Sequence, residues 1–232
     1  MDEHAKKILD QNKKVYDIIA PLFAQTRQNL WDDIKMSEPY LKDGISVLDI
    51  GCGTGRLYQL FKKFQGVEYI GIDQSDGQIE VAKKEFPEAT YMIGEMTELA
   101  FDDEQFDMVY CIAAFHHLPN KELLLKSLNE MKRVLKPGGH IIMTNWNLQS
   151  DSVKKVVAKG KLKQDGQDFI VPWLHSQGEV LGERYYYSFT PEELEGLFEE
   201  VGLEIEKQYY SHKGKEAPIK KPGNIVSVIV KE

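Results

Sequence analysis

The stretch VLDIGCGTG, residues 47–55, decides the fold of this 232-residue chain. The apolar run that ends at Ile50 predicts a buried strand, and the three glycines after it predict a tight turn into a helix over about residues 57–64. A second strand is expected over residues 67–72, and Asp73 stands at its end. An acid at this place suits the hydroxyls of a ribose, and glycine lets a ligand approach the backbone. The pattern therefore predicts a site for an adenosine-containing cofactor.

The spacing of the glycines separates two classes of cofactor. A dinucleotide site has the spacing G-x-G-x-x-G, which leaves room for a pyrophosphate at the helix N-terminus. Here the spacing is G-x-G-x-G, and Asp49 lies two residues before the first glycine. An acid there repels phosphates and attracts a cation, which favours S-adenosyl-L-methionine (product S-adenosyl-L-homocysteine) over NAD. A glycine turn that only packs a strand against a helix is the alternative. The residues expected to bind the cofactor are Tyr16, Asp49, Gly51, Cys52, Gly53, Gly55, Asp73, Gln74, Ser75, Glu95, Met96 and Ala113.

Outward from this turn, strands and helices alternate every twenty to thirty residues, which is typical of a parallel sheet with crossover helices. Two final strands, residues 203–210 and 224–230, have no helix between them and are expected to form an antiparallel edge. Helices are expected on both faces, so the class is α/β. A single domain is expected, with a helical lid at 1–42 that breaks near Pro21, a cofactor-binding core at 43–146, an irregular substrate-side insertion at 147–189, and a last helix and antiparallel strands at 190–232.

By these motifs the chain resembles the class I S-adenosylmethionine-dependent methyltransferases over residues 45–146, which implies a Rossmann-like seven-stranded sheet. A narrower resemblance, to the tRNA wobble-uridine carboxymethyl methyltransferases, covers both ends and the insertion. It rests on VYDIIAP at 15–21, Phe23, Thr26, Arg27, Trp31, Ser75-Asp76-Gly77, His116-His117, Pro137-Gly138-Gly139, QDFIVPW at 167–173, RYYY at 184–187 and Gly223-Asn224. The resemblance implies that the acceptor is the carboxylate of a carboxymethyl group on the wobble uridine of tRNA. It also implies a small zinc-binding activator subunit as a partner.

The acceptor side of the site is expected to orient a carboxylate, which is ionised near neutral pH and needs no general base. Arg27, His116 and His117 are the candidate catalytic residues. The expected substrate-binding residues are Trp146, Trp173, Arg184 and Tyr185. Structural histidines, core aromatic residues and a half-buried edge segment are the alternatives for these side chains. No further ligands accompany the histidine pair, so no metal site is expected.

Charge limits the partners of the chain, whose net charge is −8. Bulk acidity excludes broad coating of nucleic acid, but residues 151–163 and 207–221 each have a local balance of +4. These lysine-rich segments are expected to hold tRNA locally, although solvated loops are the default for such runs. The first residues contain no signal-peptide pattern and no apolar run could span a membrane, and Cys52 and Cys111 are too few for a disulfide framework. A cytoplasmic protein without membrane partners is therefore expected.

Two other classes of function stay open at this point. A small-molecule O-, N- or C-methyltransferase would use the same cofactor site and would need a base near the methyl group. A non-catalytic module would bind S-adenosylmethionine or a partner protein without turnover.

Overall fold

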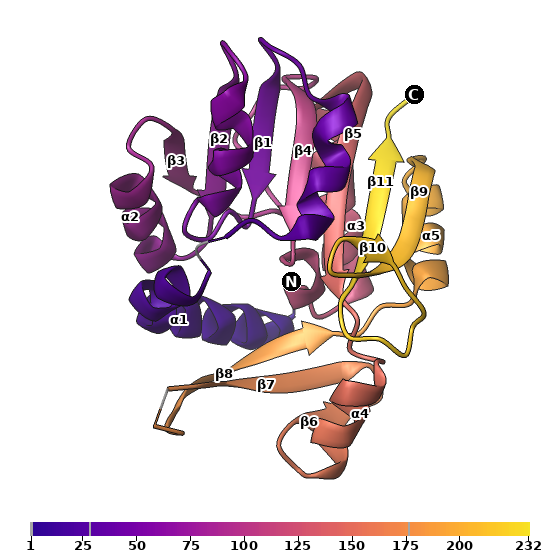
Figure 1. Cartoon of the computed structure of the whole chain (residues 1–232). Coiled ribbons are helices and arrows are strands. Elements are labelled where there is room, and N and C mark those ends of the chain that lie inside the picture. Colours follow the sequence, from indigo (N-terminus) through magenta and orange to yellow (C-terminus); the bar gives the residue numbers. More distant parts are fainter. Residues whose placement is uncertain (1, 28, 176) are drawn as a thin grey trace.

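The computed structural model describes residues 2–27, 29–175 and 177–232, in which one large sheet forms the centre of the molecule (Figure 1). Its strands are β1 (Ser46–Ile50), β2 (Glu68–Asp73), β3 (Thr90–Ile93), β4 (Phe106–Ile112), β5 (Leu135–Trp146), β9 (Glu204–His212), β10 (Lys215–Glu216) and β11 (Asn224–Val230). They lie in the order β10-β9-β11-β5-β4-β1-β2-β3. The strands β1 to β5 run parallel, and β11 lies antiparallel between β5 and β9. The expected α/β class and antiparallel edge are confirmed.

The strand count differs from the expected seven. Among the described residues the large sheet has eight strands, because the two-residue strand β10 pairs with β9. Strand β1 has β2 on one side and β4 on the other, so the chain reverses direction across the sheet at this point. In open parallel sheets a ligand crevice lies at such a switch point, at the carboxyl ends of the strands.

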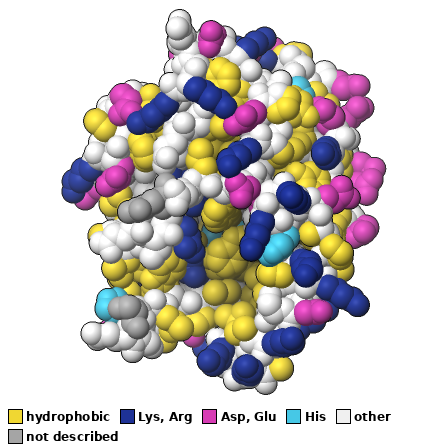
Figure 2. Space-filling view, in the orientation of Figure 1, with side chains coloured by type: hydrophobic (Ala, Val, Ile, Leu, Met, Phe, Trp, Pro, Cys, Tyr) yellow, Lys and Arg dark blue, Asp and Glu magenta, His cyan; other side chains and the backbone are white. Residues whose placement is uncertain are grey.

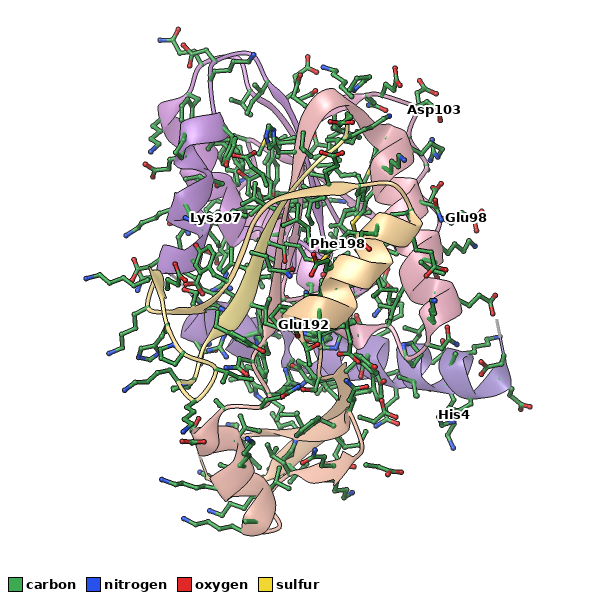
Figure 3. The ribbon with its side chains drawn as sticks, turned by 90° about the vertical axis from the view of Figure 1, so that its right-hand side faces the viewer. His4, Glu98, Asp103, Glu192, Phe198 and Lys207 are labelled. Atoms are coloured by element: carbon green, nitrogen blue, oxygen red, sulfur yellow. The ribbon has the colours of Figure 1, made fainter. Side chains whose placement is uncertain are left out.

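Helices cover both faces of the sheet (Figure 3). They are α1 (Glu3–Thr26), η1 (Asp32–Tyr40), η2 (Arg56–Lys63), α2 (Asp76–Glu85), η3 (Phe115–His117), α3 (Lys121–Val134), α4 (Asp151–Ala158) and α5 (Pro191–Glu200), where η denotes a 3-10 helix. A core cluster around Phe198 and Leu128 fills the side of α3 and α5. A second cluster around Phe61 and Tyr110 fills the side of η1 and η2. The glycine turn therefore lies in a sheet that is buried on both faces.

Helix α1 lies across the carboxyl ends of the parallel strands (Figure 1). It continues through Pro21, where a break was expected. One turn before Pro21, α1 is bonded to the start of α2. Asp17 Oδ1 accepts hydrogen bonds from Ser75 Oγ (2.6 Å) and from the Gly77 backbone N–H (3.1 Å). Tertiary contacts thus offset the lost backbone hydrogen bond at the proline.

The prediction of an irregular insertion at residues 147–189 is wrong. These residues form α4 and a second, three-stranded antiparallel sheet of β6 (Lys163–Asp165), β7 (Asp168–Leu174) and β8 (Val180–Tyr187). Strand β8 packs under α1, and a side chain at Gly182 would lie 2.5 Å from Val15 Cγ2. The insertion carries Pro172 within β7, and its aromatic and charged residues do not alternate simply, so the usual strand pattern is absent.

Candidate cofactor and acceptor site

The glycine turn connects β1 to η2 and forms one wall of a pocket at the switch point. Gly51, Gly53 and Gly55 all have positive φ angles, of 69°, 54° and 76°. A Cβ atom on Gly51 would lie 2.4 Å from Ala114 Cβ, and one on Gly55 would lie 2.5 Å from the Tyr91 hydroxyl. The turn is therefore closed against β4 on one side and β3 on the other, and only glycine fits at these two positions.

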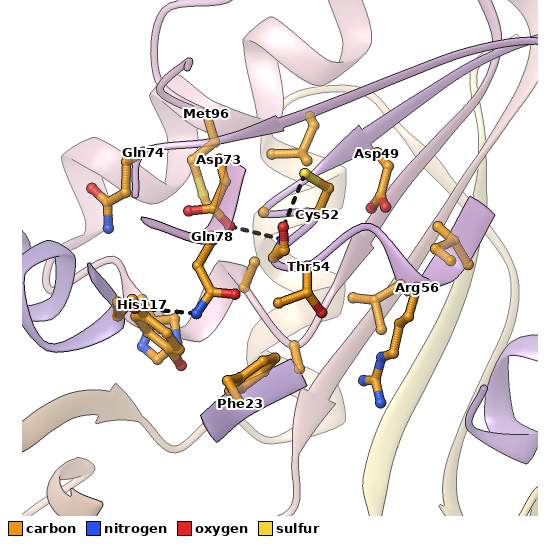
Figure 4. Close-up of a pocket in the computed structure, with 18 of the residues that line it drawn as sticks. Phe23, Asp49, Cys52, Thr54, Arg56, Asp73, Gln74, Gln78, Met96 and His117 are labelled. Carbon is orange, nitrogen blue, oxygen red and sulfur yellow. Dashed lines mark hydrogen bonds between the residues drawn. The ribbon is translucent and has the colours of Figure 1, made fainter. Parts of the chain in front are cut away.

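Asp73, at the end of β2, is aimed at the turn (Figure 4). Its Oδ2 accepts the Gly53 N–H at 3.0 Å, and its Oδ1 accepts the Ser75 N–H at 2.9 Å. Burial raises the pKa of this carboxyl to about 6, although both backbone hydrogen bonds lower it. Each oxygen keeps a further lone pair, so the carboxylate is held rigidly and can still accept two ribose hydroxyls.

Asp49 gives the floor of the pocket an acid that is 2% exposed. Its Oδ2 accepts a hydrogen bond from the Tyr69 hydroxyl at 2.6 Å, and burial, assisted by the charge of Asp73, raises its pKa to about 7. No Lys or Arg within the described ranges forms an ion pair with it. A buried carboxyl without a counter-cation favours a positively charged ligand, which fits the ammonium and sulfonium of S-adenosylmethionine better than a pyrophosphate.

Gln74, Glu95 and Met96, which were predicted to bind the cofactor, also line the pocket. Ala113, at the exit of β4, adopts a left-handed conformation with φ of 54°, and its N–H donates to the Thr144 carbonyl at 2.9 Å. This conformation turns the chain sharply at the pocket wall with only a methyl group as side chain. Glu95 is exposed, in keeping with a residue at the mouth.

The pocket is lined by three arginines, Arg27, Arg56 and Arg184, and none of them forms an ion pair with a described residue. Arg184 is 3% exposed, and its Nη1 donates to the Tyr16 hydroxyl at 3.4 Å. Its guanidinium carbon lies 5.0 Å from the ring centre of Trp173 and 5.3 Å from that of Tyr186. Aromatic faces stabilise a buried cation but leave its donors available for an anion.

Arg56 and Arg27 reinforce this positive character near the turn. Arg56 lies over Trp31, with 4.3 Å between its guanidinium carbon and the ring centre. Burial and then the charge of Arg27 lower the pKa of Arg56 to about 10. The charge of Asp49 acts on the pKa of Arg56 in the opposite direction, so both an acid and a second cation of the pocket act on this arginine.

The structure gives His117 a different role from the predicted catalytic one. Its Nδ1 lies 2.7 Å from the Tyr185 carbonyl and its Nε2 lies 2.9 Å from the Tyr16 hydroxyl. Burial lowers its pKa to about 3, so the ring is neutral at physiological pH. With the proton assigned to Nδ1, Nε2 accepts from Tyr16, and the ring fixes that tyrosine. His117 lines the pocket but is not a cation for an acceptor carboxylate.

His116 lies outside the pocket lining and is fully buried. Its Nδ1 accepts the Trp146 N–H at 3.3 Å, and its ring lies 4.9 Å from that of Tyr186. Burial, together with the charges of His117 and Arg184, holds its pKa well below the usual range. The position supports packing behind Trp146 rather than contact with a ligand.

The structure places Tyr186, rather than the predicted Tyr185, in the pocket. Tyr186, which was not predicted, lines the pocket and stacks on Trp146 with ring centres 4.7 Å apart. Tyr185 points to the other face of β8, where its hydroxyl donates to Asp168 at 2.6 Å. Side chains alternate along a strand, so Arg184 and Tyr186 share one face and Tyr185 the other.

The structure brings most of the predicted site residues into one pocket. Those that line it are Tyr16, Arg27, Asp49, Gly51, Cys52, Gly53, Asp73, Gln74, Glu95, Met96, Ala113, His117, Trp146 and Arg184. Ser75 lies outside, because its hydroxyl donates to Asp17 and accepts the Gln78 N–H at the start of α2. Gly55, His116, Trp173 and Tyr185 also lie outside the lining.

Several lining residues were missed by the sequence analysis. They include Phe23, Trp31, Thr54, Arg56, Gln78 and Tyr186. The position of Arg56 directly after the glycine turn was a usable signal, whereas Tyr186 required the strand β8 to be recognised first.

Neither a metal cluster nor a membrane span is found within the described ranges. No group of three or more His, Cys, Asp or Glu side chains there could hold a metal ion. Likewise, no helix in that part of the chain has both the length and the apolar character needed to cross a bilayer.

Comparison with known sequences finds a matching domain family and named relatives. The profile of the family described as "Methyltransferase domain" matches residues 48–143. A Homo sapiens protein named "Probable tRNA methyltransferase 9B" is 29% identical over 75% of this chain and 35% of its own length. This chain spans about a third of that protein and of its mouse and bovine counterparts. A "tRNA (carboxymethyluridine(34)-5-O)-methyltransferase" of Schizosaccharomyces pombe is 29% identical over 85% of this chain and 90% of its own length.

Solved structures have the same fold. A SAM-dependent methyltransferase from Methanosarcina mazei has a TM-score of 0.67 at 22% identity, covering 84% of this chain and 96% of the other. A Haloferax volcanii methyltransferase in complex with the Trm112 methyltransferase activator has a TM-score of 0.66 at 18% identity, covering 93% and 96%. Residues 48–143 therefore form a methyltransferase domain, and the chain has the fold of the S-adenosylmethionine-dependent methyltransferases, whose cofactor is S-adenosyl-L-methionine. Within that class, both sequence relatives described above carry names that refer to tRNA.

Proposed function

We propose that the chain transfers a methyl group from S-adenosyl-L-methionine to the carboxylate of a carboxymethyl group on the wobble uridine of tRNA. One observation carries the proposal. Arg184 is buried, has no carboxylate partner among the described residues, and faces the same pocket as Asp49 and Asp73. Leaving a buried cation without an anion is costly, so an anionic acceptor is the simplest complement to this pocket.

The reaction needs no general base from the protein, because the acceptor carboxylate is already ionised. Bound S-adenosylmethionine supplies an electrophilic methyl group: a carboxylate oxygen forms the new O–CH₃ bond, the S–CH₃ bond breaks, its electrons remain on sulfur, and no proton moves. Asp73 and Asp49 would hold the ribose and the cationic end, and Arg184 would orient the acceptor carboxylate by its guanidinium donors. Helix α1, with Tyr16 fixed by His117, would cover the pocket and exclude water.

The names of the relatives support the tRNA acceptor. The Schizosaccharomyces pombe relative is named for carboxymethyluridine 34 and aligns with 85% of this chain. The alignment reaches beyond the family profile at 48–143, so it is consistent with a shared acceptor side as well as a shared cofactor core.

A small-molecule methyltransferase is the second candidate, and one observation favours it. The Tyr16 hydroxyl donates to the neutral Nε2 of His117 at 2.9 Å, an arrangement that can relay a proton from a phenol-type acceptor. Such a reaction would slow as His117 is replaced by a residue that cannot accept a proton, whereas carboxyl methylation would depend on Arg184.

An activator subunit is part of the proposal, supported by the Haloferax volcanii complex. Strand β3 lies at one edge of the large sheet, and its residues Met92 and Ile93 are 39% and 49% exposed. An unpaired strand edge with apolar side chains is suited to pairing with a strand of another chain. The variant Met92→Asp/Ile93→Asp should lose co-purification with an activator from the same source and keep cofactor affinity.

The test uses labelled S-adenosylmethionine and tRNA that carries carboxymethylated wobble uridine, with and without that activator. Base-labile label in tRNA is expected, because a methyl ester hydrolyses in alkali. Label that resists alkali, or transfer to phenols and amines but not to tRNA, would sink the proposal in favour of the second candidate. Cofactor binding without transfer to any acceptor would favour a non-catalytic binding module.

A further inference from the structure

Two lysine-rich segments that are far apart in the sequence lie side by side. The first is α4 with the turn after it, and the second is the region of β10 and the loop that leads to β11. The Asp151 N–H at the start of α4 donates to the Lys220 carbonyl at 3.1 Å. The fold therefore combines two local charge runs, each balanced at +4 over residues 151–163 and 207–221, into one surface.

This surface, called here the basic strip, is not neutralised from within. The basic strip consists of Lys154, Lys155, Lys159, Lys161, Lys213, Lys215, Lys220 and Lys221. All eight are exposed, and none forms an ion pair with another residue that the structure describes. Lysines that only solubilise a surface are commonly interspersed with acids, and here Asp151 and Glu216 are the only acids in the two segments.

The strip begins at the rim of the pocket. Trp146 lines the pocket, and the next residue, Asn147, donates its side-chain amide to the carbonyls of Ile219 (2.7 Å) and Lys221 (3.0 Å). Figure 2 shows Lys and Arg side chains gathered along the lower right of the molecule, next to a hollow with apolar walls. The loop of the second segment is thereby tied directly to the acceptor side.

The opposite rim has the opposite sign. Residues 76–95, which run from α2 through β3 to the pocket mouth, carry five acids against Lys83 and Lys84. A polyanion that enters the pocket is therefore attracted along one side and repelled along the other.

We infer that the basic strip holds the phosphate backbone of RNA on one flank only of the acceptor nucleotide. This inference rests on the proposed function for the acceptor, and it adds the direction in which the strand leaves the pocket. Exposed lysines act as point charges on phosphates, so the strip contributes affinity and position rather than sequence readout.

The experiment measures binding and turnover separately, with an anticodon stem-loop RNA as the probe. Two double variants address the strip: Lys154→Glu/Lys155→Glu in α4 and Lys220→Glu/Lys221→Glu in the loop. The matched control is Lys83→Glu/Lys126→Glu, which changes the charge equally at exposed positions away from the strip. Each strip variant should weaken RNA binding about tenfold and flatten the dependence of log Kd on log salt by about one unit, since each lost phosphate contact changes that slope by ~0.7. Cofactor affinity should be unchanged.

A second measurement tests the one-sided grip. Neutral methylphosphonate linkages are placed on the 5′ flank or on the 3′ flank of the acceptor nucleotide. Replacement on one flank should weaken binding to the wild type, and replacement on the other should not. Equal losses from both flanks, an equal loss in the control variant, or tighter binding to acidic phospholipid vesicles than to RNA would overturn the inference. Absence of methyl transfer by the wild type would contradict the proposed function, while the binding results would still decide on the strip.

Discussion

The two halves of the pocket are built in different ways and carry opposite charge. The cofactor half is made from strand ends and backbone turns, and its acids, the buried Asp49 and the half-buried Asp73, have raised pKa values. The acceptor half is made from side chains of α1 and β8, with Arg184 among aromatic rings and His117 neutral. Neither the two acids nor Arg184 forms an ion pair with a residue that the structure describes, so under the proposed function the acids suit a cationic cofactor and Arg184 an anionic acceptor.

The largest effect is expected at the ribose contact. Asp73→Ala removes the predicted acceptor of two ribose hydroxyls and the observed acceptor of the Gly53 and Ser75 N–H groups. Hydrogen bonds to a charged group contribute about 1.5–3 kcal/mol each, so cofactor affinity should fall by at least ~10²-fold in calorimetric titration.

Asp76→Ala is the matched control for this substitution. Asp76 is three residues further along, is exposed, and pairs with Lys13 at the surface. An equal loss in the control, or unchanged affinity in Asp73→Ala, would mean that the cofactor site has been misplaced.

The next effect separates the two halves directly. Arg184→Met should lower kcat/KM for the acceptor by about 10²-fold, because truncating one partner of a buried charge pair costs ~2–5 kcal/mol. Cofactor affinity should stay within about twofold, because Arg184 contacts only the acceptor half. Arg184→Lys should recover part of the loss, since it keeps the charge and loses the planar fork. A fall in cofactor affinity comparable with the fall in turnover would remove the distinction between the halves.

The comparison also explains what the sequence could predict. The cofactor half follows from local constraints: Gly51 allows no side chain beside Ala114, and Asp73 ends a buried strand, so residue type and spacing specify the geometry. The same constraints gave the alternating parallel core and its antiparallel edge correctly. A site whose geometry is set by the backbone can thus be predicted from a single sequence.

The acceptor half depends on contacts between distant segments. His117 is paired with Tyr16 over 101 positions and with the Tyr185 carbonyl over 68, and no local pattern reveals that both ring nitrogens are occupied. Strand β8 was not recognised, so its alternation could not show that Tyr186 rather than Tyr185 faces the pocket. The sequence therefore predicted a contact between His117 and the acceptor without revealing that the same ring also holds Tyr16 and β8.

A smaller effect concerns pH and the cofactor half. Burial raises the pKa of Asp49 to about 7, so in the free protein this carboxyl gains a proton as the pH falls from 8 to 6. The cationic cofactor favours the ionised form, so its affinity should fall by up to about tenfold per pH unit below 7. In Asp49→Asn the affinity should be lower at pH 8 and nearly flat down to about pH 6.5, below which Asp73 titrates. A wild-type affinity that does not change between pH 8 and 6 would contradict the raised pKa.

The smallest effect tests the alternation along β8. Tyr185→Phe removes a hydrogen bond to Asp168 on the face away from the pocket, so it should lower the free energy of unfolding by about 1 kcal/mol and leave the acceptor KM unchanged. Tyr186→Phe keeps the ring that stacks on Trp146 but removes a hydroxyl 3.4 Å from that of Tyr16, so it should raise the acceptor KM by a few fold. Steady-state kinetics and thermal unfolding of the pair distinguish the two faces. The reverse result, with KM changed only in Tyr185→Phe, would mean that the acceptor approaches from the Asp168 side and that Arg184 is structural.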